Sequence, residues 1–264
     1  MIAYLSCTGN TRWAAEHLAH SLNECLVSIP DAIAEDHIYN IKKGERVGIC
    51  FPVHGWKLQP IIIDFIERLQ AEGGNKPYVF ILLTAGDSCG EVLEQVGERL
   101  KAKGWGIDAA CSLIMPESYI GLPFMDVDTD LREAEKKMEA HKVLTRFTDD
   151  VLYHRTTRLN IVRGYLPRLY SRVIGPFFHR FLIRDDRFHL DASRCTGCGR
   201  CVKACPVHNM QMQNALPTWL HNGRCLTCFA CYHHCPNHAI DFWHFTRKKG
   251  QYFFSHNKQS SLSR

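Results

Sequence analysis

Apolar runs alternate with helical patterns along residues 1–150. The runs that predict strands are Ile2–Leu5, Cys25–Ile29, Val47–Phe51, Tyr78–Leu83 and a weaker fifth, Ala109–Ile114. Several of them are apolar throughout, as expected for parallel strands that are covered on both faces. Between them the apolar period lengthens to three or four residues, as in Ile62, Phe65 and Ile66, which is typical of amphipathic helices. Strands joined by helical crossovers predict an α/β domain with a doubly wound, five-stranded parallel sheet.

The loop after the first strand combines hydroxyl side chains with the start of a helix. Its residues are Ser6, Thr8, Gly9, Asn10 and Thr11. A helix N-terminus presents free N–H groups that favour an anion, and Gly9 permits a tight turn, so the loop predicts a phosphate cradle without a lysine. The simpler alternative is an N-cap on an ordinary first helix. The chain contains neither GxxxxGK[ST] nor GxGxxG, which argues against a nucleotide-hydrolysing loop and a dinucleotide site.

Two more strand ends should emerge at the same edge of the sheet, where doubly wound domains bind ligands. The residues after the third strand are Pro52, Val53, His54, Gly55 and Trp56, and those after the fourth are Thr84, Ala85, Gly86, Asp87 and Gly90. Trp56 offers a face to a flat aromatic ring, and the glycines let the backbone approach the edge of that ring. His54 lies where it could contact such a ring or donate a proton to it.

Residues 1–150 resemble the flavodoxin family, which carries FMN on three such loops. The family's phosphate motif, [ST]-x-T-G-N-T, is complete over Ser6–Thr11. The resemblance implies a sheet of order 2-1-3-4-5, an FMN phosphate on Ser6–Thr11, and a flavin ring flanked by residues 51–56 and 84–90. Trp56 is the side chain expected to cover the ring.

Eight of the thirteen cysteines form two copies of one motif, C-x2-C-x2-C-x3-C-P. The first copy is Cys195, Cys198, Cys201 and Cys205, and the second is Cys225, Cys228, Cys231 and Cys235. Zinc sites and disulfides are the alternatives, but a zinc ribbon needs only paired CxxC motifs. The third cysteine and the Cys-Pro ending, each repeated, favour two [4Fe–4S] clusters, since this is the spacing of bacterial iron–sulfur proteins.

Residues 190–245 are therefore predicted to form a small α+β domain, and residues 190–243 resemble a two-cluster ferredoxin. In that arrangement the fourth cysteine of each motif ligates the other cluster. One cluster would be held by Cys195, Cys198, Cys201 and Cys235, and the other by Cys225, Cys228, Cys231 and Cys205. The five remaining cysteines are interpreted as structural: Cys25, Cys50 and Cys111 lie in strand patterns, and Cys7 and Cys89 lie in the proposed flavin loops.

Charge divides the chain in the same way as the motifs. Residues 1–150 carry 15 basic and 23 acidic side chains, whereas residues 151–264 carry 17 basic and 4 acidic ones. The two halves could dock on each other, or the basic half could meet an anionic partner. Residues 246–264 are basic and then polar, and we expect them to form a C-terminal tail that ends frayed.

The connector, residues 151–189, contains eight arginines and two aspartates. Its apolar residues recur every three to four positions and predict a basic amphipathic helix or helix pair: Val162, Leu166, Tyr170, Val173, Phe177 and Phe181. This stripe could pack on the two domains, lie on an anionic membrane surface or accompany nucleic-acid binding. We favour packing, because the first half is acidic and the clusters must be kept near the flavin. Peripheral membrane contact comes second, and nucleic acid last.

The whole chain resembles the flavodoxin–ferredoxin fusion proteins of anaerobic microbes. The resemblance implies an oxidoreductase or electron carrier that passes electrons between FMN and two [4Fe–4S] clusters, with a ferredoxin, flavodoxin or reductase as its partner. The alternative is a ferredoxin-dependent reductase of a small organic substrate or quinone. No apolar run reaches the roughly 18–20 residues that span a bilayer, and no export signal begins the chain, so we expect a cytoplasmic protein.

Overall fold

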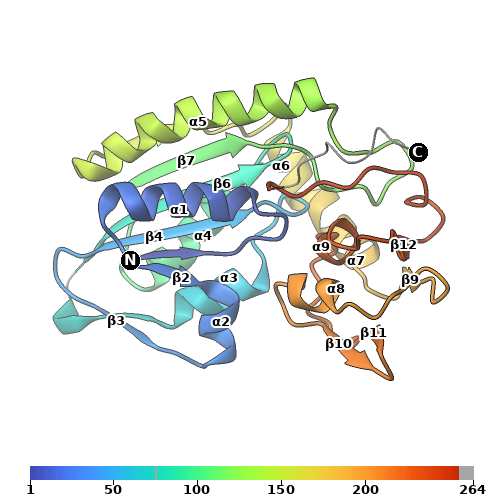
Figure 1. Cartoon of the computed structure of the whole chain (residues 1–264). Coiled ribbons are helices and arrows are strands. Elements are labelled where there is room, and N and C mark those ends of the chain that lie inside the picture. The colour runs from blue at the N-terminus through green and yellow to red at the C-terminus, as the bar shows by residue number, and fades with distance from the viewer. Residues whose placement is uncertain (75, 256–264) are drawn as a thin grey trace.

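A six-stranded parallel sheet organises the first half of the computed structural model, which describes residues 1–74 and 76–255 (Figure 1). Its order is β2-β1-β4-β6-β7-β8. The strands are β1 (Ile2–Tyr4), β2 (Leu26–Ser28), β4 (Arg46–Pro52), β6 (Tyr78–Ala85), β7 (Ala109–Ile114) and β8 (Thr157–Leu159). The five predicted strands are confirmed in the predicted order. The sixth, β8, comes from the connector and pairs with β7; its short Thr-Arg-Leu sequence carries no apolar run that could have predicted it.

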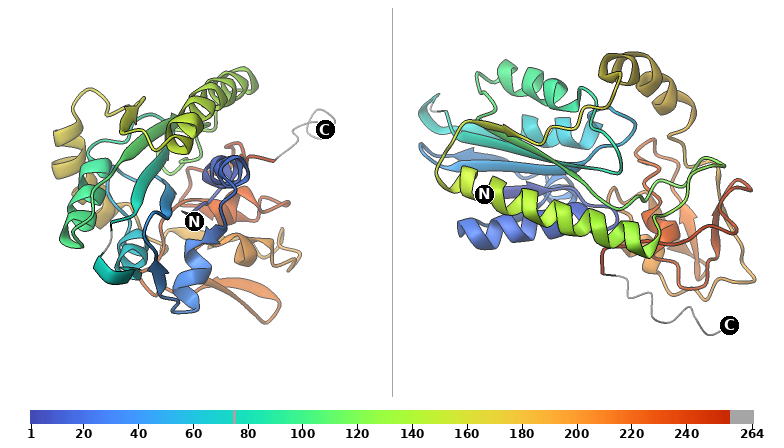
Figure 2. Two further views of the ribbon diagram at one scale, coloured as in Figure 1. Left: turned by 90° about the vertical axis from the view of Figure 1, so that its left-hand side faces the viewer. Right: turned by 90° about the horizontal axis from the view of Figure 1, so that it is seen from above.

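Helices cover both faces of this sheet (Figure 2). On one face lie α1 (Asn10–Leu22) and α5 (Asp130–Leu152), whose Leu18 and Leu144 share a core with strand residues. The other face is covered by α2 (Ile29–Ala34), α3 (Pro60–Glu67) and α4 (Val92–Ala102). Strands β3 (Tyr39–Ile41) and β5 (Leu69–Ala71) form a separate parallel pair, and a 3-10 turn, η1 (Glu72–Gly74), follows β5. The two cores leave the carboxyl ends of the strands free for a site.

The second half is built from short elements around a third core. The elements are β9 (Phe188–Leu190), α8 (Arg200–Ala204), β10 (Met210–Gln213), β11 (Leu216–Trp219), α9 (Ala230–His233) and β12 (Ile240–Phe242). Strands β9 and β12 pair antiparallel, and β10 and β11 form a hairpin. The core also contains Ile120, which follows β7, so the first domain contributes to the packing of the second.

A continuous helical run connects the two parts. It consists of α6 (Pro167–Leu169), a π-helical turn η2 (Tyr170–Ile174) and α7 (Gly175–Phe181). The predicted packing of its apolar stripe holds for Tyr170, whose ring lies 4.7 Å from that of Trp56, but not for Val173 and Phe177, which are each 60% exposed. The face that turns inward contains Ser171 and Gly175 instead; a side chain at Gly175 would meet the carbonyl oxygen of Gly55 at 2.8 Å. Small residues allow this close approach, and they determine which face of the run is buried.

Residues 246–255 return to the first domain as a strap. The Tyr252 hydroxyl donates to Oδ1 of Asn10, and the Phe254 N–H donates to the carbonyl of Thr8 at 2.8 Å. The Phe254 ring stacks on Trp13 with 5.1 Å between centroids. Tyr252 and Phe254 of the predicted tail are therefore packed against the phosphate-loop motif and the helix that follows it. The polar end that we expect to be frayed, residues 256–264, lies outside the described residues.

Within the described part of the chain, no helix combines the length and the apolar character needed to cross a bilayer.

Candidate functional site

A cavity of about 430 Å³ lies beyond the carboxyl ends of the sheet. The predicted ring contacts that line it are Val53, His54, Gly55, Trp56, Ala85, Gly86 and Asp87. The remaining walls come from the loop after β7, from α7 and from the second cysteine motif, where Cys228 borders the cavity. Two loops that the sequence pattern singled out therefore meet, as expected of strand ends that share one sheet edge.

His54 and Tyr119 place buried polar groups in the cavity wall. His54 Nδ1 and the Tyr119 hydroxyl have no hydrogen-bond partner among the described residues. Burial, and then the charge of His179, lowers the pKa of His54 to about 4, so its ring is neutral at ordinary pH. Burial also raises the pKa of Tyr119, which keeps the hydroxyl protonated. Unpaired polar atoms between apolar walls suit the rim of a flavin ring, which offers both donors and acceptors.

Glu117 is a second titratable group of this wall. It follows β7, is held by the backbone N–H groups of Ser118 and Tyr119 at 2.9 and 2.8 Å from Oε1, and packs its carboxylate against Gly86. Burial raises the pKa of this carboxyl. Sequence reasoning missed the loop of Glu117 and Tyr119; the signal was a polar Pro-Glu-Ser-Tyr segment directly after the fifth strand.

Trp56 lies in the cavity wall, as expected of a side chain predicted to cover the flavin ring, but it also contacts the connector. Its indole N–H donates to Oγ of Ser88 at 3.1 Å, and its ring lies 4.7 Å from that of Tyr170. The three remaining predicted ring residues lie behind the cavity wall. Thr84 Oγ1 bonds Thr11 Oγ1 at 2.8 Å, Pro52 accepts from Gln59, and Gly90 makes room for Ser171 and Trp56.

The predicted phosphate loop lies beside the cavity and lines a second hollow of about 540 Å³. Ser6, Thr8 and Gly9 border this hollow together with the basic residues Arg12 and Lys203. Gly9 has a φ of 94°, as a tight turn before α1 requires, and the first helical residues, Asn10 and Thr11, are buried. A glycine turn, a helix N-terminus and two nearby cations fit a phosphate group.

The first candidate cluster site is assembled from both cysteine motifs. Cys195, Cys198 and Cys201 surround a small hollow that is completed by Cys235 from the second motif. This is the cross-motif set that the ferredoxin resemblance implies. Burial raises the pKa of the Cys201 thiol to about 11, so its thiolate needs the compensating charge of bound iron.

The second cluster site brings together the other four cysteines. Burial, followed by the charges of Cys228, Cys225 and Cys205, raises the pKa of Cys231. Burial likewise raises the pKa of Cys225 to about 12. No three His, Cys, Asp or Glu side chains in the described residues converge as they would around one metal ion. A cubane instead takes each thiolate at a separate iron, and four grouped thiols fit that arrangement.

Backbone N–H groups donate to cysteine sulfurs at matching positions of the two motifs. Gly197 N and Thr227 N donate to Cys195 and Cys225, each at 3.4 Å. Two further pairs lie at the ends of the motifs: Asn209 N to Cys205 at 3.3 Å and Ala239 N to Cys235 at 3.2 Å. These bonds stabilise negative charge on the sulfur atoms, as iron–sulfur clusters require.

The structural interpretation of the other five cysteines holds for Cys50, Cys89 and Cys111, which are buried, but not for the remaining two. Cys25 is exposed at the start of β2, because the strand begins one residue later. Cys7, in the phosphate loop, lies against the side chain of Cys228, and this neighbour together with burial raises the pKa of the Cys7 thiol. The contact joins the two halves at a cluster ligand.

Comparisons with protein families assign the two halves of the chain to two different families. Residues 1–113 match the flavodoxin domain family, and residues 194–240 match the 4Fe–4S dicluster domain family. These matches imply FMN and iron–sulfur clusters as the cofactors and electron transfer as the chemistry. A search of curated proteins found no match to this chain.

Solved structures with similarity to this chain include three bacterial proteins. A protein of Bacteroides uniformis ATCC 8492 described as a flavoprotein is 20% identical, with a TM-score of 0.31 over 42% of this chain and 88% of that one. The Trp repressor binding protein of Bacillus subtilis is 14% identical, with a TM-score of 0.34 over 55% and 99%. The Flv1 flavodiiron core of Synechocystis sp. PCC6803 is 15% identical, with a TM-score of 0.28 over 55% and 35%.

Proposed function

We propose that this flavodoxin–ferredoxin fusion protein passes electrons between one FMN and two [4Fe–4S] clusters within a single chain. The observation that carries the proposal is the position of Cys228, which belongs to the second cluster site and also borders the proposed flavin cavity. A cluster held at Cys228 would lie directly beside a flavin ring in that cavity. Electron exchange requires a short separation between the two cofactors, and a shared wall at Cys228 would give a flavin and a cluster that separation.

The cofactors carry the redox chemistry: FMN takes one or two electrons, and each cluster passes one. The chain positions them and controls protons. Neutral His54 adds no charge to the cavity, whereas the carboxyl of Glu117, with its raised pKa, can hold a proton on Oε2 while Oε1 accepts two backbone bonds. The apolar wall around these groups excludes water and strengthens their electrostatic effect.

The ligand sets follow the grouping of the side chains. Ser6–Thr11 would hold the FMN phosphate, and the loops after β4, β6 and β7 the ring. One cluster takes Cys195, Cys198, Cys201 and Cys235, and the other takes Cys225, Cys228, Cys231 and Cys205. The protein would act in the cytoplasm in anaerobic metabolism, with its basic half docking on an acidic ferredoxin, flavodoxin or reductase.

The test uses the full chain purified without oxygen. We expect about eight irons and one FMN per chain, as two four-iron cubanes and one flavin require. After rapid mixing with less than one equivalent of reductant, absorbance should follow the flavin and freeze-quenched EPR the clusters. Electron exchange between them should proceed at a rate that does not depend on protein concentration. A rate proportional to concentration would contradict transfer within one chain, and protein that retains no flavin would contradict the proposal as a whole.

The second candidate is a ferredoxin-dependent reductase of a small organic substrate or quinone. It is favoured by Phe177, which lines the cavity and is 60% exposed, so the cavity reaches the surface at an apolar edge. Steady-state turnover with reduced ferredoxin and a panel of quinones distinguishes the two functions. A reductase shows saturation with one acceptor, whereas a carrier reduces acceptors at rates that rise linearly with their concentration.

A further inference from the structure

The helical run α6–η2–α7 presents an apolar stripe to solvent. We define the stripe as Leu166, Leu169, Val173, Phe177 and Phe181, all between 42% and 60% exposed. Their separations of three and four residues place them on one face of the run. The run is about 22 Å long at 1.5 Å per residue, and it lies on the outer surface of the molecule, as the view from above shows (Figure 2).

This stripe is not a packing face of the described fold. The opposite side of the run is already packed on the first domain. There Ser171 is 4% exposed, and the Phe178 ring lies 5.3 Å from that of Tyr119. The Ser171 hydroxyl also accepts the N–H of Glu91 at 2.8 Å. An exposed row of five large apolar side chains on a fixed helix is unusual in a soluble domain and marks an interaction surface.

The charges beside the stripe are positive. Arg168 is 84% exposed at its side chain, and the Arg180 guanidinium lies over the Phe181 ring. Two carboxylates near the run face three arginines: Glu91 pairs with Arg172 at 2.7 Å and with Arg168 at 4.0 Å, and Glu94 pairs with Arg163. With Arg180 added, positive side chains outnumber negative ones around the stripe. The surface that surrounds the stripe is therefore cationic and would attract an anionic partner.

We propose that the apolar stripe docks this protein on an anionic lipid surface, with the run lying in the plane of the headgroups. Aromatic and aliphatic side chains on one face with arginines at its edges are the features of interfacial helices, which bury their apolar face roughly 5–10 Å deep. Arginines beside such a helix add attraction to anionic lipids. The inference does not rest on the proposed function, although docking would bring the cavity edge at Phe177 to lipid-soluble acceptors.

The test measures binding of the full, cofactor-loaded chain to sedimented vesicles. We expect binding to phosphatidylglycerol–phosphatidylcholine vesicles that weakens with salt, and little binding to pure phosphatidylcholine. Val173→Asp should weaken binding about tenfold or more, since it removes an apolar side chain that lipid would bury and adds a charge that anionic headgroups repel. The matched control is Met138→Asp on α5, where Met138 is 58% exposed; it should bind as the wild type does.

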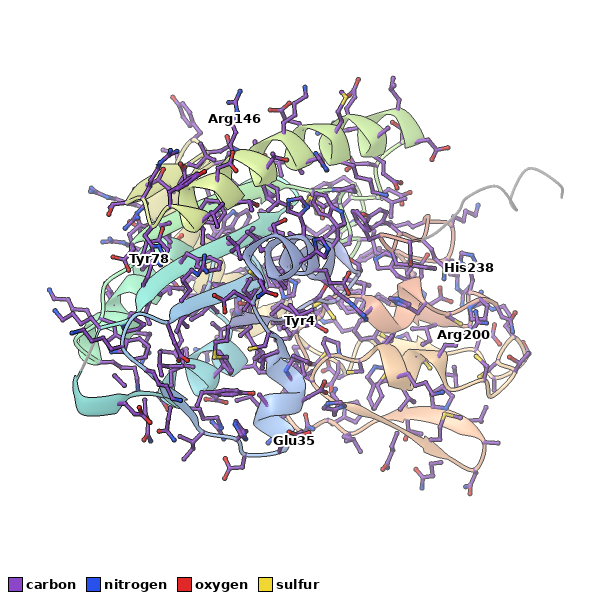
Figure 3. All side chains as sticks on the ribbon, turned by 60° about the vertical axis from the view of Figure 1, so that its left-hand side comes forward. Tyr4, Glu35, Tyr78, Arg146, Arg200 and His238 are labelled. Atoms are coloured by element: carbon purple, nitrogen blue, oxygen red, sulfur yellow. The ribbon has the colours of Figure 1, made fainter. Side chains whose placement is uncertain are left out.

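A second pair of variants tests the charge. Arg168→Gln should weaken binding about fivefold, the value for one arginine near an anionic surface. Arg146→Gln is the control, because Arg146 is exposed and projects outward from α5, a different helix (Figure 3). Equal binding of Val173→Asp and Met138→Asp would overturn the proposal. So would a wild type that ignores vesicles but loses binding to an acidic ferredoxin when Val173 is changed, which would make the stripe a protein-docking surface. The visible spectrum of each variant separates these outcomes from loss of the cofactors.

Discussion

The two cysteine motifs have the same spacing and the same local geometry but different surroundings. The first motif surrounds a hollow that the hairpin residue Pro217 helps to line, and its Cys198 is exposed. The second motif faces the first domain: Cys228 lies against Cys7 of the phosphate loop and borders the proposed flavin cavity. Spacing therefore determines which cysteines group together, whereas packing determines whether a group faces the proposed flavin cavity or the surface.

The motifs also differ in the residues that take a left-handed backbone. Gly197 and Gly199 have φ values of 67° and 70°, and the equivalent Thr227 and Phe229 have 46° and 58°. Glycine adopts this conformation without strain, whereas other residues lose roughly 1–2 kcal/mol. The side chains of the second motif offset that cost, because Phe229 is 1% exposed and packs 5.4 Å from Tyr119 of the first domain. Interdomain packing thus replaces the conformational freedom of glycine.

Replacing the fourth cysteine of each motif by alanine should have the largest effect and tests this comparison most directly. Cys205→Ala should remove the second cluster although Cys205 ends the first motif, and Cys235→Ala should remove the first. Each variant should retain about four of the eight irons. Each folded variant is alkylated and its peptides are mapped by mass, which identifies the lost cluster. In Cys205→Ala we expect Cys225, Cys228 and Cys231 to react. Reaction at Cys195, Cys198 and Cys201 in that variant would refute the cross-motif ligation.

Substitution of Phe229 sharpens the difference between the two turns. Phe229→Ala should lower the free energy of unfolding by about 3–5 kcal/mol, the cost of deleting a buried aromatic ring. Phe229→Gly should lose about 1 kcal/mol less, because glycine removes the left-handed strain. Gly199→Ala should cost about 1 kcal/mol from strain alone, since only Met212 Sδ lies within 4.0 Å of the added methyl group. Anaerobic urea titrations measure all three; a Phe229→Gly variant as stable as the wild type would disprove the compensation.

The smallest expected effect concerns the strap that holds the second half against the phosphate loop. Tyr252→Phe removes the donor to Oδ1 of buried Asn10 and should lower the free energy of unfolding by about 1 kcal/mol. Tyr165→Phe, at a side chain that is 93% exposed, should change it by much less. Thermal unfolding of both variants under argon provides the measurement. Equal stability of the two would show that the strap bond contributes nothing.

Much of the fold and part of the site could be predicted because they depend on short, local patterns. The five strand runs are apolar because parallel strands are covered on both faces, and their carboxyl ends brought His54 and Gly86 to one cavity. Cysteine spacing sufficed for the ligand groups, since three thiolates of each site come from one turn of chain. In contrast, β8 lacked any periodic or motif signal, and the Glu117 loop showed only a polar segment directly after the fifth strand.

The sequence by itself determined the α/β sheet, the three loops at one edge and the eight paired cysteines, because neighbouring residues encode these features. The order of the strands came instead from the resemblance to flavodoxins. Only the tertiary structure decided which face of the connector is buried, which cysteine group borders the proposed flavin cavity, and where the strap returns. The stripe and its opposite face have the same period, so the close approach permitted by Ser171 and Gly175 decided between them. Tyr252 and Asn10 stand 242 residues apart in the chain, and no local pattern records a contact at that distance.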